Sequence, residues 1–258
     1  MQDLIPLDTV DLVSAVALMV ITVGLSAWEN LGLEIKLLTA GGRTILQLLV
    51  LGYVLDFIFA LNNLGVVVAI LAILVTLAAI VTRNKIGKKI PLVLPLVWGS
   101  IFLSMAVAVL YANFLIINPS RWYEPRYVIP LAGMIIGQAM NAAAITGDRL
   151  VSTINSSHVE IETHLSLGAT PSQAIAQYRR EAIKAGLIPT INQMTIVALV
   201  TLPIFMSGQL LGGVSGAEAA SYEILILMMM AFANLLTTIL ITRGLCRQFF
   251  NTKAQLVS

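Results

Sequence analysis

The chain has 258 residues, of which 58% are hydrophobic and only 11% are charged, and its mean hydropathy is +0.92. Soluble domains carry about 25% charged residues, so this composition excludes an ordinary soluble protein and indicates a membrane protein that crosses the bilayer several times. The net charge of +2, without basic runs interleaved with aromatic residues, gives no indication of nucleic-acid binding.

A helix that crosses a bilayer needs about 20 consecutive, mostly apolar residues. The sequence has seven segments of about this kind, which predict an all-α, polytopic integral membrane protein with about seven transmembrane helices in one domain covering residues 1–258. The acidic N-terminus lacks the basic region and cleavage site of a secretory signal, so we expect it to be retained. The predicted spans are 10–27, 43–60, 64–81, 92–117, 127–144, 187–207 and 222–241.

The basic residues are distributed unevenly between the two sides of these spans. If the N-terminus is extracytoplasmic, only Arg121 and Arg126 of the 15 Lys and Arg residues lie outside. Cytosolic loops carry the excess of Lys and Arg, so the sequence predicts a multi-pass protein of the inner (plasma) membrane with a cytoplasmic C-terminus. This orientation places the polar segment 148–187, between the fifth and sixth predicted helices, in the cytosol.

The sequence contains no motif that would supply chemistry of its own. A GxxxxGK[ST] loop and an HExxH pair are both absent, and the lone Cys246 cannot form an internal disulfide. His158 and His164 are six residues apart and therefore do not share a helix face, which argues against a metal site there. We expect a non-catalytic chain without a cofactor; no set of metal ligands is identified, and any energy source must lie elsewhere.

The polar segment contains a Gly and a Pro between two short helical patterns. Gly168 and Pro171 predict a helix, a tight turn and a second short helix, since Gly permits a sharp turn and Pro is tolerated in a first helical turn. Thr170 is placed to cap the second helix. Such an exposed, rigid element suits docking to a soluble partner, although an ordinary amphipathic surface helix would show the same pattern.

Polar side chains at membrane depth cost free energy unless they meet a partner or a water-filled path. Each polar side chain found in the predicted spans, Asn234 among them, can line a translocation path or form an interhelical hydrogen bond. Met134 and Met140 lie near Gln138 and Asn141 of the fifth predicted span, and each can act as a thioether ligand or as packing. The path candidates are Gln47, Gln138, Asn141, Asn192 and Gln193, with Met134 and Met140.

Two further features of the spans have alternative interpretations. Gly133 and Gly137 form a GxxxG pattern, which permits close helix packing either within one chain or across a homodimer. Asp56 in the second span either binds a cation or reaches the outer interface, four residues before a turn. Pro130, Pro189 and Pro203 predict kinks in or near spans.

The turn resembles the EAA-type coupling loop of ABC transporter permeases, with Glu162 six residues before Gly168. It departs from that pattern, because Thr163 and His164 replace two alanines and Pro189 falls later than usual. The whole chain is more similar to the family of FetB-type iron-export permeases and related plant aluminium-tolerance permeases. The segments that carry this similarity are 42–43 with 47, 52–55, 129–134 with 137 and 139–140, 165–171, 185–190, and 202–203 with 206–208.

This resemblance implies a homodimer that pairs with two separate ATP-binding subunits, which hold ATP and Mg²⁺, and exports iron or another metal across the lipid bilayer.

A nucleotide sugar or other organic solute is an alternative substrate, mildly disfavoured because no span has a basic cluster. An ATP-independent secondary transporter would need ionisable residues deep in several spans, and apart from Asp56 almost none is found. A membrane-embedded enzyme lacks paired catalytic groups. The implied contacts with the ATPase are Glu162, Leu165, Leu167, Gly168, Ala169, Thr170, Pro171, Gln173 and Ala174.

Overall fold

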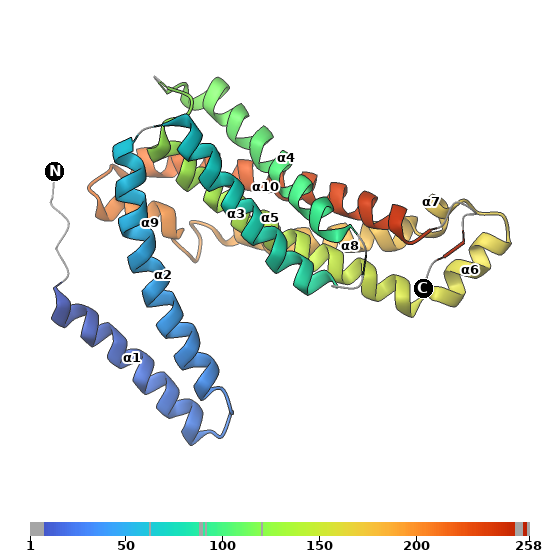
Figure 1. The fold of residues 1–258 in the computed structure, drawn as a ribbon, viewed down its shortest axis with the longest axis horizontal. Coiled ribbons are helices and arrows are strands. Elements are labelled where there is room, and N and C mark those ends of the chain that lie inside the picture. The colour runs from blue at the N-terminus through green and yellow to red at the C-terminus, as the bar shows by residue number, and fades with distance from the viewer. Residues whose placement is uncertain are drawn as a thin grey trace.

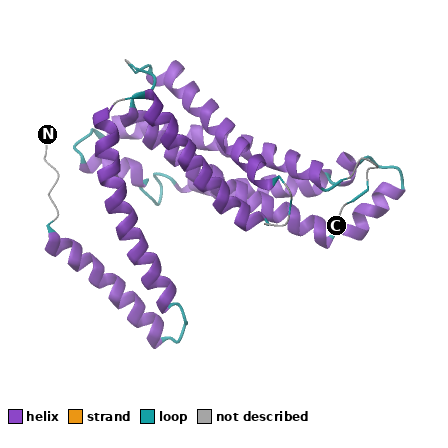
Figure 2. Cartoon of the chain, viewed as in Figure 1, coloured by secondary structure: helices purple, strands orange, loops and turns teal. Residues whose placement is uncertain are grey.

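The structure is a computed structural model that describes residues 8–61, 63–87, 90, 92–119, 121–250 and 255–256. Helices make up nearly all of this described part, and extended segments meet there only in two isolated bridges (Figure 2). The helices are α1 (Thr9–Trp28), α2 (Glu34–Leu61), α3 (Leu64–Ile86), α4 (Val93–Ala112), the π-helix η1 (Asn113–Ile117), α5 (Pro125–Ser156), α6 (His158–Ser166), α7 (Pro171–Ala174), α8 (Ala176–Ile196), α9 (Ile204–Leu211) and α10 (Gly216–Gln248).

Six helical segments in the described residues are long and apolar enough to cross a membrane. This confirms an all-helical protein with several spans, but it does not confirm the predicted count of seven. The six segments are Val10–Trp28, Glu34–Leu61, Leu64–Ile86, Val93–Ile117, Pro125–Ser156 and Gly216–Gln248.

The difference lies in the predicted sixth span, 187–207, which is not one continuous helix. α8 ends at Ile196, and an irregular segment follows in which Ala198 has a φ of 61°. Pro203 then precedes α9. Because Pro restricts the residue before it and Ala198 leaves the right-handed helical region, the helix cannot run through this segment. The apolar run is therefore divided between the end of α8 and the short α9.

Several helices extend beyond the predicted spans. α2 begins at Glu34 instead of residue 43, and α5 continues through Asp148 to Ser156. Arg243 and Arg247, which follow the predicted span 222–241, lie in α10. At 32 residues, α5 is about 48 Å long and exceeds the roughly 30 Å hydrocarbon layer. A helix of this length can reach beyond the layer, with the backbone groups of its extra turns hydrogen-bonded within the helix.

The helices α3, α4, α5, α8 and α10 pack into one elongated bundle (Figure 1). Three glycines mark close approaches between these helices, because a Cβ atom at each would meet a neighbouring side chain. Gly147 of α5 lies against Ile86 of α3, Gly244 of α10 lies against Leu96 of α4, and Gly186 of α8 lies against α5. Small residues permit such close contacts, and close van der Waals packing is what holds helices together in lipid.

The hairpin of α1 and α2 diverges from this bundle (Figure 1). α1 packs against α2, and Ser26 donates a hydrogen bond to Glu34 across the hairpin at 3.0 Å. α2 touches α3 and α5 at few positions, where Ile58 is buried. Most of the hairpin surface is therefore exposed in a single chain.

One end of the bundle carries the polar helices and many of the basic residues. α6 and α7 lie at this end, beside the C-terminal end of α10 (Figure 1). Ile86, the last residue of α3, lies against Gly147 of α5, and Leu96, near the start of α4, lies against Gly244 of α10. These parts of the four helices lie at the same end of the bundle (Figure 1). We call this region the basic end; Arg83, Lys85, Arg149, Arg179, Arg180, Arg243 and Arg247 lie on it.

Candidate functional site

The structure confirms the predicted order of a helix, a tight turn and a short helix, which lie at the basic end. α6 ends at Ser166, and Gly168 takes a φ of 91°, which L side chains adopt rarely. Ala169 N–H donates to the carbonyl of His164, and Gly168 N–H donates to that of Leu165, both at 3.0 Å. These two bonds form a Schellman motif, which satisfies the last carbonyls of α6 and reverses the chain.

The short helix α7 is held by a capping box, as the position of Thr170 predicted. The backbone N–H of Thr170 donates to the side chain of Gln173 at 2.9 Å, and the Thr170 hydroxyl accepts from Gln173 N–H. Pro171 occupies the first turn, where no intrahelical partner for its nitrogen is needed. A cap of this kind contributes about 1 kcal/mol, which matters for a helix of only four residues.

The residues of this turn differ in what they offer to a partner. Leu167 is 82% exposed, although it is a large apolar side chain. Ala174 and Ile175 are buried in the main core, and Leu165 packs against it. The turn therefore has an anchored side and a free side, and Leu167 lies on the free side.

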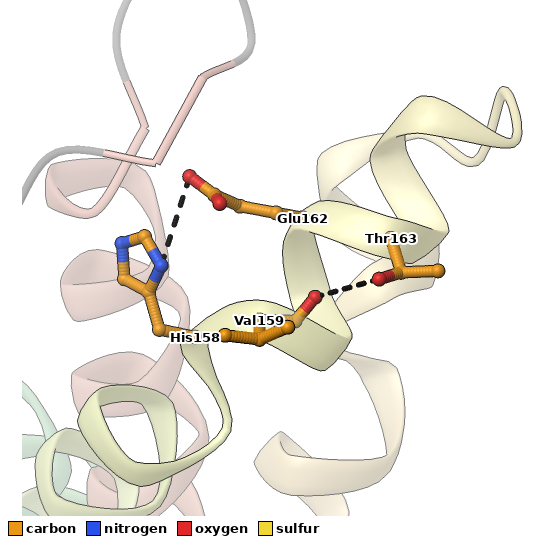
Figure 3. Close-up of polar contacts among 4 residues, drawn as sticks. All are labelled: His158, Val159, Glu162 and Thr163. Carbon is orange, nitrogen blue, oxygen red and sulfur yellow. Dashed lines mark hydrogen bonds and ion pairs between the residues drawn. The ribbon is translucent and has the colours of Figure 1, made fainter.

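Glu162 does not point toward the turn in this structure. Its carboxylate lies 3.6 Å from Nδ1 of His158, one turn earlier on α6 (Figure 3). Thr163 donates its hydroxyl hydrogen bond to the carbonyl of Val159 at 2.8 Å. The His158 side chain is 37% exposed and that of Glu162 is 55% exposed, so the pair adds little stability and leaves Glu162 available to other groups.

Tyr178 connects α6 to the start of α8. The side chain packs against the main core, and burial together with the neighbouring Glu160 raises the pKa of its hydroxyl. The phenol therefore stays neutral at physiological pH and can donate a hydrogen bond. α8 therefore contacts α6 through Tyr178, and it also packs against α7.

The predicted path residues are distributed over three helices. Gln138 and Asn141 lie on α5, and Asn192 and Gln193 lie on α8, which packs beside it. Asn141 and Asn192 are exposed, whereas Gln138 and Gln193 are half-buried. Among the described residues, no hydrogen bond joins any two of them. The side chains remain free for a partner chain, water or solute.

The other path candidates have more specific surroundings. Gln47 lies on the exposed flank of α2 beside Leu46 and Val50. Met134 packs against a small core cluster that includes Met230, and Met140 packs against the main core. These methionine contacts match the packing interpretation.

Asn234 belongs to a contact between helices. It donates a 2.7 Å hydrogen bond to the hydroxyl of Thr190, so it joins α10 to α8. This is the interhelical alternative considered for the polar residues. Asp56 is exposed five residues before the end of α2.

The GxxxG pattern of α5 is not used within the chain. A Cβ atom at Gly133 or Gly137 would meet nothing within 4 Å. Asn141, one turn further along, is exposed on the same face. This excludes close packing of the pattern within one subunit and leaves an open face of small and polar residues.

Glu223, a buried acidic residue in α10, was not predicted from the sequence. It is 5% exposed, and its Oε2 has no hydrogen-bond partner. The carboxylate reaches the backbone N–H of Met206 in the first turn of α9. A carboxylate there stabilises a helix N-terminus, so Glu223 holds α9 against α10. The signal was a single acidic residue one position inside the predicted span 222–241.

The helical spans, the basic end and the capped turn define a multi-span membrane protein with an exposed element on one side. The chain matches the family described as Uncharacterised protein family (UPF0014) over residues 9–250, and it belongs to that family. A UPF0014 membrane protein of Synechocystis is 48% identical over 98% of both chains.

Two further relatives have names that describe a role. The probable iron export permease protein FetB of Escherichia coli is 34% identical, over 94% of this chain and 92% of its own. The protein ALUMINUM SENSITIVE 3 of Arabidopsis thaliana is 33% identical, over 93% of this chain and 86% of its own. No solved structure matches. The resemblance inferred from the sequence is thus confirmed.

Proposed function

We propose that this chain is the transmembrane permease subunit of an ABC transporter, coupled to a separate ATP-binding subunit through the turn between α6 and α7. The observation that carries this proposal is the geometry of the turn. It is exposed and rigidly capped, it presents Leu167, and it is anchored to the bundle through Ala174 and Ile175. Movement of a docked subunit would therefore reach α8 directly. ATP and Mg²⁺ would bind to the partner and not to this chain.

The proposed substrate is iron or another metal ion, and the proposed direction is export. The support is the name of the Escherichia coli relative, an iron export permease, and that of the Arabidopsis relative, which refers to aluminium. Among the described residues, no group of three or more His, Cys, Asp or Glu side chains can hold a metal. The chain would then offer a transient path and not a tight site, which suits passage of a substrate.

The test of this function is reconstitution with and without the partner. We expect inside-out proteoliposomes that contain the permease and its co-purified ATPase to take up radioactive iron only with MgATP. An ATPase variant without hydrolysis is the control, and the permease alone should be inactive. Nucleotide-independent transport by the permease alone would contradict the proposal. Labelling of a Thr170→Cys variant from the outer face would also contradict it.

We propose further that the open face of α5 meets the same face of a second copy. Gly133, Gly137 and Asn141 lie on this face, and the chain itself leaves it uncovered. Small residues permit close approach, and an exposed Asn at membrane depth gains from a partner amide. In a homodimer this face would line the path between the two copies, with Gln138 beside it.

Cysteine cross-linking tests this arrangement in a Cys246→Ser background, which removes the lone native thiol. A Gly137→Cys variant is expected to give an oxidised homodimer in membranes. Gly99→Cys on α4 is the matched control, since Gly99 is exposed and a Cβ there, as at Gly137, meets nothing within 4 Å. Cross-linking at Gly99 and not at Gly137 would place the interface on another face.

A further inference from the structure

A groove at the basic end lies between α7, α8 and α10 and is lined by three arginines. Its volume is about 470 Å³. Arg179 comes from α8, and Arg243 and Arg247 come from α10. Pro171 and Ser172 of α7 form another part of the wall. Arginines from two helices thus line one groove.

These three arginines have no acidic partner among the residues that the structure describes. The ion pair found there is that of His158 with Glu162, on α6. Like charges that share a cavity repel one another, and an anion that enters it relieves this repulsion. The planar guanidinium group presents several N–H donors in a fork that matches phosphate oxygens. The chemistry of the groove is therefore that of a phosphate site.

The depth of the groove identifies the source of the phosphate. The apolar part of α10 ends at Ile241, which is buried, and Arg243 follows two residues later. Arg247 lies one turn beyond, about 6 Å further along the helix. The headgroup layer extends about 5–7 Å beyond the hydrocarbon on each side, so the two arginines lie at the level of lipid phosphates. Basic pockets between helices at this level bind anionic headgroups.

We propose that this groove binds the headgroup of an anionic phospholipid of the adjacent leaflet, with its phosphate between Arg179, Arg243 and Arg247. The buried side chains of Ile175 and Cys246 line the groove as well and give it an apolar part. Because α7 forms part of the wall, a bound lipid contacts the short helix and holds it against the bundle. The site requires no ATPase, so it can be tested on this chain alone.

The experiment measures binding of phosphatidylglycerol to the purified full chain by native mass spectrometry, with phosphatidylcholine as the neutral comparison. Replacement of each arginine by glutamine is expected to weaken phosphatidylglycerol binding roughly fivefold. The triple variant R179Q/R243Q/R247Q should lose the preference over phosphatidylcholine. The matched control is R149Q/R180Q/K184Q, which removes the same charge from exposed residues that do not line the groove.

A second readout uses a Ser172→Cys variant in the Cys246→Ser background, because Ser172 is exposed in the groove wall whereas Cys246 is buried. Phosphatidylglycerol, but not phosphatidylcholine, is expected to slow maleimide labelling of the introduced thiol in the otherwise native sequence and in the control variant, but not in the triple variant. Equal loss of binding in both triple variants would overturn the proposal, since it would indicate diffuse charge. Displacement of the lipid by millimolar inorganic phosphate would assign the groove to free phosphate. If the triple variant R179Q/R243Q/R247Q bound phosphatidylglycerol as before but no longer bound the ATPase, the groove would be assigned to an acidic part of that partner.

Discussion

Replacement of Gly168 by valine is expected to reduce ATP-driven transport at least tenfold while the permease remains folded in the membrane. Gly168 has a φ of 91°, and a β-branched residue in this region costs about 1–2 kcal/mol. A side chain at this position meets nothing within 4 Å, so the substitution acts on the backbone and not through a clash. The Schellman bonds of Gly168 and Ala169 would be lost, and α7 would change its direction. Transport and ATP hydrolysis by the assembled complex are the measurements.

Gly168→Asn is the matched variant for this prediction, because asparagine tolerates positive φ much better than valine. We expect it to retain most of the transport, with Gly168→Ala between the two. ATP hydrolysis should persist in the valine variant without transport, which separates uncoupling from loss of assembly. Full transport by Gly168→Val would show that the direction of α7 does not matter. The prediction rests on the proposed ABC function, and normal protein level in the membrane is its control.

The turn could be predicted from the sequence because its causes are local. Gly168, Thr170 and Pro171 act on their own backbone and on neighbours within five residues. The spans were predicted for a similar reason, since the length of an apolar run sets whether a helix can cross a bilayer. The break near Ala198 was missed because the apolar run 187–207 passes through it. Hydropathy does not reveal a residue that leaves the helical region.

Packing partners could not be predicted, because they depend on which helices meet. The sequence drew attention to Gly133 and Gly137, yet the chain leaves both open. The close approaches occur at isolated glycines without a pattern, such as Gly186. Glu223 was overlooked for the same reason, since its importance follows from the position of α9 beside it. These features belong to tertiary structure, and the periodicity of one helix does not show them.

Replacement of Gly186 by valine is expected to destabilise the bundle by about 1–3 kcal/mol or more, because it overpacks the contact between α8 and α5. A Cβ atom at Gly186 would overlap the Thr146 hydroxyl and lie 2.9 Å from the carbonyl oxygen of Ala142. The backbone oxygen cannot move without bending α5. One turn along α8, Thr190 accepts the 2.7 Å bond from Asn234 of α10. A displaced α8 would weaken that bond as well.

Thermal unfolding of the purified protein and its level in the membrane measure this effect. Gly99→Val is the control, since Gly99 is exposed on α4 and has open space at its Cβ; we expect it to be close to the native protein. Gly186→Ala should be less destabilising than valine. Thr146→Ala should recover part of the loss in Gly186→Ala, because it removes the hydroxyl nearest to the new methyl group. This hydroxyl is buried without a hydrogen-bond partner, so its removal alone should cost little. If the two substitutions were additive, Thr146 would not be what confines Gly186, and the close approach of α8 to α5 would have another cause.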